Sequence, residues 1–177
     1  MLSFTNLTLR RGTAVLFSDV SLTLHQGQKA GLVGANGAGK TSLFRLICGE
    51  LEADTGDLSF PASTRIAWLQ QEIPATPQPA IEYVLDGDTA LRRIEAAIST
   101  AEQDENYSAI GQLHEQLDSI DGYSARSRAG QLLAGLGFTN DQFELPLSAF
   151  SGGWRIRLNL AQTLMTPSDL LLLDEPT

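Results

Sequence analysis

The segment Gly34-Ala-Asn-Gly-Ala-Gly39-Lys40-Thr41 carries the strongest fold signal in this chain. It matches the pattern G-x-x-x-x-G-K-[ST], in which glycines let the backbone curl until successive N–H groups point at phosphate oxygens. A short buried strand is predicted before it at residues 30–33, and a helix after it at residues 41–50 adds its positive N-terminus. The segment therefore predicts a phosphate site formed by Gly34, Ala35, Asn36, Gly37, Ala38, Gly39, Lys40, Thr41 and Ser42.

Two carboxylates, Asp174 and Glu175, follow a run of leucines at residues 170–173. The run predicts a strand of a sheet covered on both faces, and open α/β sheets bind ligands at the carboxyl ends of such strands. Beside a phosphate site, we expect Lys40 to bridge the β- and γ-phosphates of a nucleotide. Thr41 and Asp174 are expected to hold Mg²⁺, and Glu175 to act as the general base that prepares the attacking water.

Composition and charge exclude several classes of protein. The chain has 177 residues, enough for one domain or one domain with an insertion, and a formal net charge of −9, with Lys29 and Lys40 as its lysines. An acidic domain has no general attraction to nucleic acid or to anionic membranes. The sequence has neither an apolar run of membrane-spanning length nor a signal-peptide layout at its start. Because Cys48 lies in an apolar run, we interpret it as a core residue. A single cysteine cannot form an internal disulfide, which agrees with a reducing compartment, so we expect a cytoplasmic protein without membrane contact.

Hydrophobic patterning predicts an α/β fold with a strand-rich N-terminal lobe and a helical insertion. Strands are predicted at residues 2–9, 20–24, 56–60 and 65–69. Prolines between residues 74 and 79 interrupt regular structure. Apolar stripes between residues 86 and 137 then predict helices, of which the first two form an antiparallel hairpin over residues 88–120. A helix over residues 154–165 returns the chain to the core.

This patterning divides the chain into three expected parts. Residues 1–85 form the nucleotide-binding core, and residues 86–137 form the helical insertion. Residues 138–177 contribute the returning helix and the last strand.

The segment Ser151-Gly152-Gly153 opens the returning helix and offers a second anion site at a helix N-terminus. Followed one helix later by the leucine run and its two carboxylates, it makes the chain resemble the ATP-binding cassette (ABC) ATPases. Their signature is typically Leu-Ser-Gly-Gly, and here Phe150 replaces the leucine. The resemblance implies that Ser151, Gly152 and Gly153 complete the ATP site of a second cassette. It also implies a glutamine that senses the γ-phosphate and Mg²⁺, for which Gln71 is preferred over Gln70.

Two departures from the family pattern bear on activity. Arg11 stands where the family usually stacks an aromatic residue on adenine, so the choice of nucleotide base stays open. The family's switch histidine has no counterpart, because neither His25 nor His114 lies at the right place. We therefore expect the chain to be the front portion of one cassette, truncated after Thr177, which binds ATP weakly and does not hydrolyse it alone.

The residues after Gly153 narrow the resemblance. The run from Ser151 to Ala161 is similar to the ABC-F proteins, whereas transporter subunits more often have glutamine in place of Trp154. ABC-F proteins also carry a helical arm in the interval of the hairpin over residues 88–120, although every cassette has a helical subdomain there. The resemblance implies a cytoplasmic ATPase with a second cassette in the same chain. That protein would bind the ribosome in its ATP-bound form, through rRNA, ribosomal protein or tRNA.

Two other functions stay open at this point. An ATP-binding subunit of a membrane transporter would need a membrane partner, and a nucleotide-gated binding module would leave most turnover to its partner cassette. The hairpin is acidic, whereas a surface that faces RNA should be basic. Its charged residues are Asp88, Glu95, Glu102, Asp104, Glu105, Glu115 and Asp118 against Arg92 and Arg93. The expected contacts are therefore with ribosomal protein, or with tRNA through the two arginines alone.

Overall fold

The computed structural model describes residues 1–69 and 75–174 of the chain. These residues pack as two units, one formed by Met1–Ile66 with Asp169–Asp174 and the other by Ala67–Ser168. The chain contains both helices and strands, in agreement with the predicted α/β fold. Within the described ranges, no helix combines the length and the apolar character that a membrane crossing needs. The expected division of the chain into three parts, with boundaries after residues 85 and 137, assigns a role to each part. That division stays a prediction.

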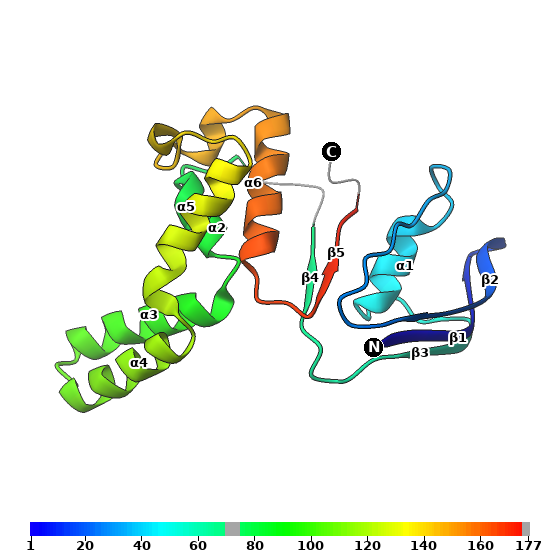
Figure 1. Ribbon diagram of the computed structural model, residues 1–177, viewed down its shortest axis with the longest axis horizontal. Coiled ribbons are helices and arrows are strands. Elements are labelled where there is room, and N and C mark those ends of the chain that lie inside the picture. Colours follow the sequence, from blue (N-terminus) through cyan, green and yellow to red (C-terminus); the bar gives the residue numbers. More distant parts are fainter. Residues whose placement is uncertain (70–74, 175–177) are drawn as a thin grey trace. The chain divides into compact units, whose positions relative to one another are not determined.

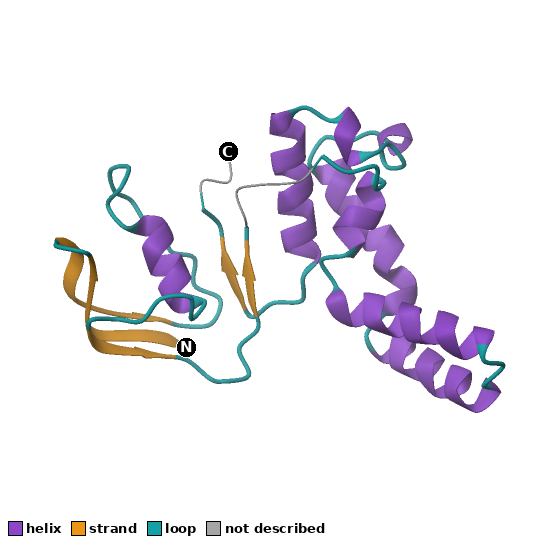
Figure 2. Cartoon of the chain, turned by 180° about the vertical axis from the view of Figure 1, so that it is seen from behind, coloured by secondary structure: helices purple, strands orange, loops and turns teal. Residues whose placement is uncertain are grey.

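The first unit is built on a three-stranded antiparallel sheet in the order β2-β1-β3 (Figure 2). Its strands are β1 (Leu2–Arg11), β2 (Ala14–Leu24) and β3 (Thr55–Ser59). Alternation along β1 buries Leu2 and Phe4. A register irregularity around Asn6, whose φ is 49°, then shifts the alternation so that Leu7 and Leu9 are buried as well. The strands predicted near residues 2–9, 20–24 and 56–60 are thereby confirmed.

Helix α1 (Lys40–Ile47) follows the glycine-rich segment and buries Leu46 and Ile47. It confirms the predicted helix, although it ends before residue 50. Cys48 comes directly after it and is half-buried. Burial, with a smaller contribution from the charge of Glu50, raises the pKa of the Cys48 thiol. A thiol of raised pKa stays protonated at neutral pH, which agrees with a packing role.

Strand β4 (Ile66–Trp68) forms a two-stranded sheet with β5 (Leu170–Leu172), and both strands were predicted. Along β5 and the residues after it, Leu172 and Asp174 are buried, whereas Leu171 and Leu173 are exposed. Such alternation is typical of a strand with one covered face. The expectation that this run is covered on both faces is therefore wrong for the described part of the chain.

The buried strand predicted over residues 30–33 is also wrong. These residues form no strand, and the side chain of Val33 is 96% exposed. A strand exists only where a neighbouring strand completes its backbone hydrogen bonds. In the described ranges β4 and β5 pair with each other, and residues 30–33 have no such neighbour. An apolar run alone does not distinguish these cases.

The second unit is helical, and Figure 1 shows α3 and α4 lying side by side as a hairpin. Its helices are α2 (Ala80–Leu85), α3 (Thr89–Gln103), α4 (Tyr107–Ser119), α5 (Ala125–Gly135) and α6 (Gly152–Met165). Short 3-10 turns lie at η1 (Gly122–Ser124), η2 (Asn140–Gln142) and η3 (Leu147–Ala149). Asp88 caps α3 by accepting from the N–H of Leu91, and Asn106 caps α4 by accepting from the N–H of Ala109. The structure confirms the predicted hairpin and the returning helix.

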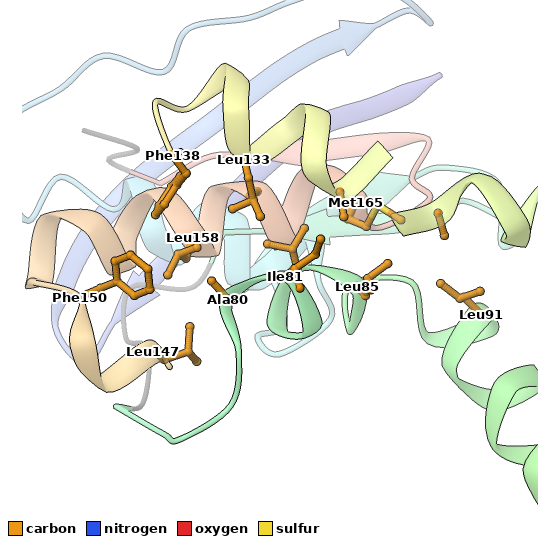
Figure 3. Packing of buried hydrophobic residues seen from close by; sticks show 14 of the residues in the cluster. Ala80, Ile81, Leu85, Leu91, Leu133, Phe138, Leu147, Phe150, Leu158 and Met165 are labelled. Atoms are coloured by element: carbon orange, nitrogen blue, oxygen red, sulfur yellow. The ribbon is translucent and has the colours of Figure 1, made fainter. Parts of the chain in front are cut away.

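A single apolar cluster holds the second unit together (Figure 3). Its fully buried side chains include Leu91 of α3, Leu133 of α5 and Leu158 of α6. The whole cluster consists of Ala80, Ile81, Val84, Leu85, Leu91, Ile94, Ile98, Leu117, Ala125, Ala129, Leu133, Phe138, Leu147, Phe150, Leu158, Ala161 and Met165. The same core therefore supports both the hairpin and the start of α6.

Helix α2 was not predicted, because the prolines before it indicated a break in regular structure. Pro79 is its N-cap residue, with φ −60° and ψ 144°. Proline is compatible with a helix entry, where its missing N–H is not needed. α2 packs against α6, and just after α2 the backbone approaches α6 so closely that a Cβ added to Gly87 would lie 2.2 Å from the carbonyl oxygen of Gln162. The proline signal thus marked the start of a helix.

The close approach at Gly87 predicts a large effect of one methyl group. Gly87→Ala is expected to destabilise the second unit by about 2 kcal/mol or more, because backbone must move to admit the Cβ. Gly111→Ala in α4 is the matched control, since nothing lies within 4 Å of its added Cβ. That control is expected to be neutral or to stabilise, by up to about 1 kcal/mol. Calorimetric melting of both variants checks this, and equal melting temperatures would contradict the close packing.

Candidate functional site

Residues 34–38 form an exposed loop that leads through Gly39 into α1. Gly37 and Gly39 have φ values of 80° and 98°, a left-handed conformation that glycine adopts without strain. Space at Gly39 is limited too, because a Cβ there would lie 3.0 Å from the Cβ of Leu16 in β2. The first backbone N–H groups of any helix lack intrahelical acceptors, and at the start of α1 no side-chain cap accepts from them. This loop (residues 34–41, the phosphate loop) has the backbone geometry of an anion cradle.

The ammonium group of Lys40 lies against the phosphate loop. Its Nζ donates to the carbonyl oxygens of Gly34 at 3.0 Å and Ala35 at 3.1 Å. An ammonium has three N–H donors, so these two bonds leave one for a further acceptor. The positive charge is thus held at the loop in which the sequence predicts phosphate binding.

Thr41 and Asp174, which the sequence pairs as expected Mg²⁺ ligands, lie in contact. The Oγ1 hydroxyl of Thr41 donates to Oδ2 of Asp174 at 2.6 Å. Asp174 is 4% exposed, and a buried carboxylate requires such a donor because its desolvation is unfavourable. A hydroxyl and a carboxylate side by side offer the hard oxygen atoms that Mg²⁺ prefers. Their assignment as metal ligands stays a prediction.

An ion pair between Arg65 and Asp169 fixes the start of β5. Nε and Nη2 of Arg65 donate to the two carboxylate oxygens of Asp169 at 3.2 Å each, and the N–H of Asp169 donates to the carbonyl of Arg65 at 2.8 Å. Hydrogen bonds from the Arg65 side chain and backbone lower the pKa of the Asp169 carboxyl. The pair was not predicted, although opposite charges at the start of one predicted strand and just before another were a usable signal. It aligns the strand whose far end carries Asp174.

The segment Ser151-Gly152-Gly153 (the signature segment) lies at the start of α6 in the second unit. Ser151 is the N-cap residue, with φ −66° and ψ 165° and no side-chain cap hydrogen bond. Its carbonyl accepts the first helical bond from the N–H of Arg155 at 2.9 Å. All three residues of the segment are exposed, so the backbone N–H groups of the first turn are accessible to a ligand. The geometry fits the predicted anion site, and its role stays a prediction.

Several expected site residues lie outside the described part of the chain. These are Gln70 and Gln71, one of which is the expected γ-phosphate sensor, and Glu175, the expected general base. Their roles therefore stay predictions. Arg11 lies at the exposed end of β1, where it pairs with Ala14 of β2, and its effect on base selectivity stays open.

Comparison with known proteins agrees with this geometry. A family model described as ABC transporter matches residues 17–177. The ATP-binding protein YheS of Escherichia coli (strain K12) is 53% identical over 177 residues, which is 100% of this chain and 28% of that protein. The ATP-binding cassette sub-family F member 3 of Homo sapiens is 37% identical over 180 residues, covering 97% of this chain and 24% of that protein. The expected resemblance to ABC-F proteins is confirmed.

A solved structure shows that the fold is shared as well. The nucleotide-free ATP-binding cassette of an ABC transporter aligns with a TM-score of 0.63 at 20% identity, covering 100% of this chain and 69% of that one. The present chain spans only 28% of YheS, so the activity of a complete protein is a separate question. On the family match, the chain belongs to the ABC transporter family, as an ATP-binding cassette similar to those of sub-family F.

Proposed function

We propose that this cassette belongs to a cytoplasmic ABC-F ATPase that binds the ribosome with ATP and leaves it after hydrolysis. The contact between Thr41 and Asp174 carries the nucleotide part of this proposal, because it places a hydroxyl and a carboxylate beside the phosphate loop. The similarity to sub-family F member 3 and YheS carries the ABC-F part. The chain alone is expected to bind ATP weakly and not to turn it over.

The residues of the phosphate loop suit Mg²⁺ and ATP by their donor chemistry. The left-handed glycines and the uncapped start of α1 supply backbone N–H donors for phosphate oxygens. Lys40 supplies a positive charge at the loop, and Thr41 and Asp174 supply hard oxygen ligands. Mg²⁺, when bound, neutralises charge on the phosphates. Gln71 would sense the γ-phosphate and help to hold Mg²⁺, and Glu175 would accept the proton of the attacking water.

A second cassette is needed to complete the site. The signature segment of this chain would face the nucleotide of that cassette, and its exposed N–H groups and uncommitted Ser151 hydroxyl suit a phosphate. ATP held between two cassettes would favour a closed arrangement, and loss of the γ-phosphate would release it. The conformational change is thus driven by the difference in affinity of the two arrangements for ATP.

The charge of the hairpin favours ribosomal protein over RNA as its contact. Arg92 is not available to a nucleic acid, because its guanidinium donates to Glu82, Asp86 and Glu95 at 2.7–2.8 Å. Partial burial opposes its charge, but the hydrogen bonds to these carboxylates outweigh burial and raise the pKa of Arg92. The sequence left open a contact with tRNA through Arg92 and Arg93. Because Arg92 is engaged by carboxylates, Arg93 is the one of the two that could make this contact.

The remaining surface of the hairpin is acidic. Its exposed carboxylates are Glu102, Asp104, Glu105, Glu115 and Asp118, and Arg93 is an exposed cation on α3. Such a surface repels phosphates and attracts lysine and arginine side chains. We therefore infer that the hairpin, acting as the arm, contacts a basic ribosomal protein.

A transporter subunit is the alternative with less support, because YheS and a sub-family F protein share higher sequence identity with this chain than the ABC transporter cassette of known structure does.

A nucleotide-gated module, in which the partner cassette performs most turnover, is tested by Glu175→Gln alone. Near-normal ATP turnover in that variant would favour the module.

Loss of the phosphate-loop charge is expected to weaken ATP binding. Lys40→Ala removes a charge-assisted hydrogen bond, and we expect ATP affinity to fall about 10- to 100-fold. Lys29→Ala is the matched control, since it removes the only other lysine, which is exposed and outside the loop. Binding of a fluorescent ATP analogue to the complete protein measures both variants. Equal affinities would rule out the assigned role of the loop.

Ribosome binding is expected to depend on the γ-phosphate. The complete protein with Glu175→Gln, and the equivalent change in the second cassette, should bind ATP without hydrolysing it and co-sediment with ribosomes. With ADP in place of ATP, the same variant should stay in the supernatant. If the variant still binds ATP but does not co-sediment with ribosomes in either nucleotide, the result would favour the alternative, an ATP-binding subunit of a membrane transporter.

A further inference from the structure

Two aromatic residues flank the signature segment, and both contact the same ring. Phe150 precedes Ser151, and its ring centroid lies 5.6 Å from that of Phe138 at an interplanar angle of 73°. Trp154 follows Gly153, and its ring centroid lies 4.7 Å from that of Phe138 at 67°. Both are edge-to-face arrangements, which are more favourable than apolar contact alone. Phe138 is 4% exposed and lies among the buried side chains around Leu158 (Figure 3).

The signature segment has little of its own to hold it in place. A Cβ added at Gly152 or Gly153 would meet nothing within 4 Å, so neither residue is packed. Ser151 makes no side-chain cap hydrogen bond. Glycine loses more conformational freedom on ordering than any other residue, so two glycines in a first turn weaken it. The direction of the N–H groups in this turn must be set by residues on either side.

Phe138 is itself rigidly placed at the end of α5. It follows Gly137, whose φ of 93° ends the helix, and its N–H donates to the carbonyl of Leu133 at 3.0 Å. Arg157 of α6 lies over the Trp154 ring at 4.8 Å and donates to the carbonyl of Leu136 at 3.4 Å. The first turn of α6 thus contacts the end of α5 through the ring pair of Trp154 and Phe138 and through the guanidinium of Arg157.

We propose that Phe138 is a positioning residue for the signature segment. The Phe138 ring contacts both Phe150 and Trp154 and so fixes the residues at both ends of Ser151-Gly152-Gly153. In this way it sets the direction of the backbone N–H groups of the segment. This inference rests on the proposed function, in which those groups bind the nucleotide of a second cassette. Phe138 is buried in the second unit and is not part of the phosphate loop, so its removal should affect turnover in the closed arrangement and leave ATP binding at that loop unchanged. Small misplacements of such groups lower rates strongly.

The test uses the complete two-cassette protein and three variants. Phe138→Leu removes the ring while keeping an apolar side chain. Phe143→Leu is the matched control, because Phe143 packs against the same core and makes no described ring contact with Phe150 or Trp154. Gly153→Asp places a carboxylate in the signature segment and tests whether that segment is used at all. ATP turnover (kcat and KM), affinity for a fluorescent ATP analogue and melting temperature are measured for each.

We expect Phe138→Leu to lower kcat about tenfold relative to Phe143→Leu, with ATP affinity unchanged and similar melting temperatures. A second pair of variants tests the same contact at Trp154, which is partly exposed, so that its replacement disturbs folding less than a change at the buried Phe138. Trp154→Phe keeps a ring and should keep most of the turnover, whereas Trp154→Leu should lose it. The positioning role is overturned if Gly153→Asp abolishes turnover while Phe138→Leu matches Phe143→Leu. If Gly153→Asp leaves turnover unchanged, the signature segment has no role in turnover, and both the proposed function and the positioning role are overturned.

Discussion

The hydrogen bond from Thr41 to Asp174 is the contact on which the first unit depends. It joins two residues that are 133 positions apart, with a donor–acceptor distance of 2.6 Å. Asp174 is buried, and a buried carboxylate without a donor is unfavourable, so this hydrogen bond supports the return of the chain to the start of α1. The pair of Arg65 and Asp169 supports the same return, because it holds the start of β5, the strand that precedes Asp174.

The second unit, Ala67–Ser168, lies in the sequence between Arg65 and Asp169 and has its own core. Its central feature is the crossing of α2 and α6, where Gly87 admits the backbone of Gln162 and the Gln162 side chain donates to the carbonyl of Tyr83 at 2.8 Å. Glu82 on the same α2 accepts from Arg92 of α3 and Arg126 of α5. Burial alone would raise the pKa of Glu82, but these arginines outweigh it and lower the pKa. One short helix therefore anchors both the hairpin and the helix that carries the signature segment.

Much of this structure could be predicted from the sequence, because it depends on local signals. The phosphate loop, helix α1 and the capped hairpin each follow from a motif, a period or a cap residue. The strand expected at residues 30–33 was wrong because strand formation depends on a partner, which an apolar run does not reveal. The ring contacts of Phe138 were not predictable either, since they join residues brought together only by packing. At the candidate site, the pairing of Thr41 with Asp174 followed from the motifs, whereas Arg65 and Asp169 lie outside every motif.

In the proposed function, Thr41 and Asp174 act together on one metal ion at the nucleotide. The most direct test is the affinity of the complete protein for ATP with and without Mg²⁺, in wild type, Thr41→Val, Asp174→Asn and the double variant. Each single substitution should remove most of the gain in affinity that Mg²⁺ provides, and the double variant should lose little more. An equal gain from Mg²⁺ in all four proteins would contradict a shared metal site.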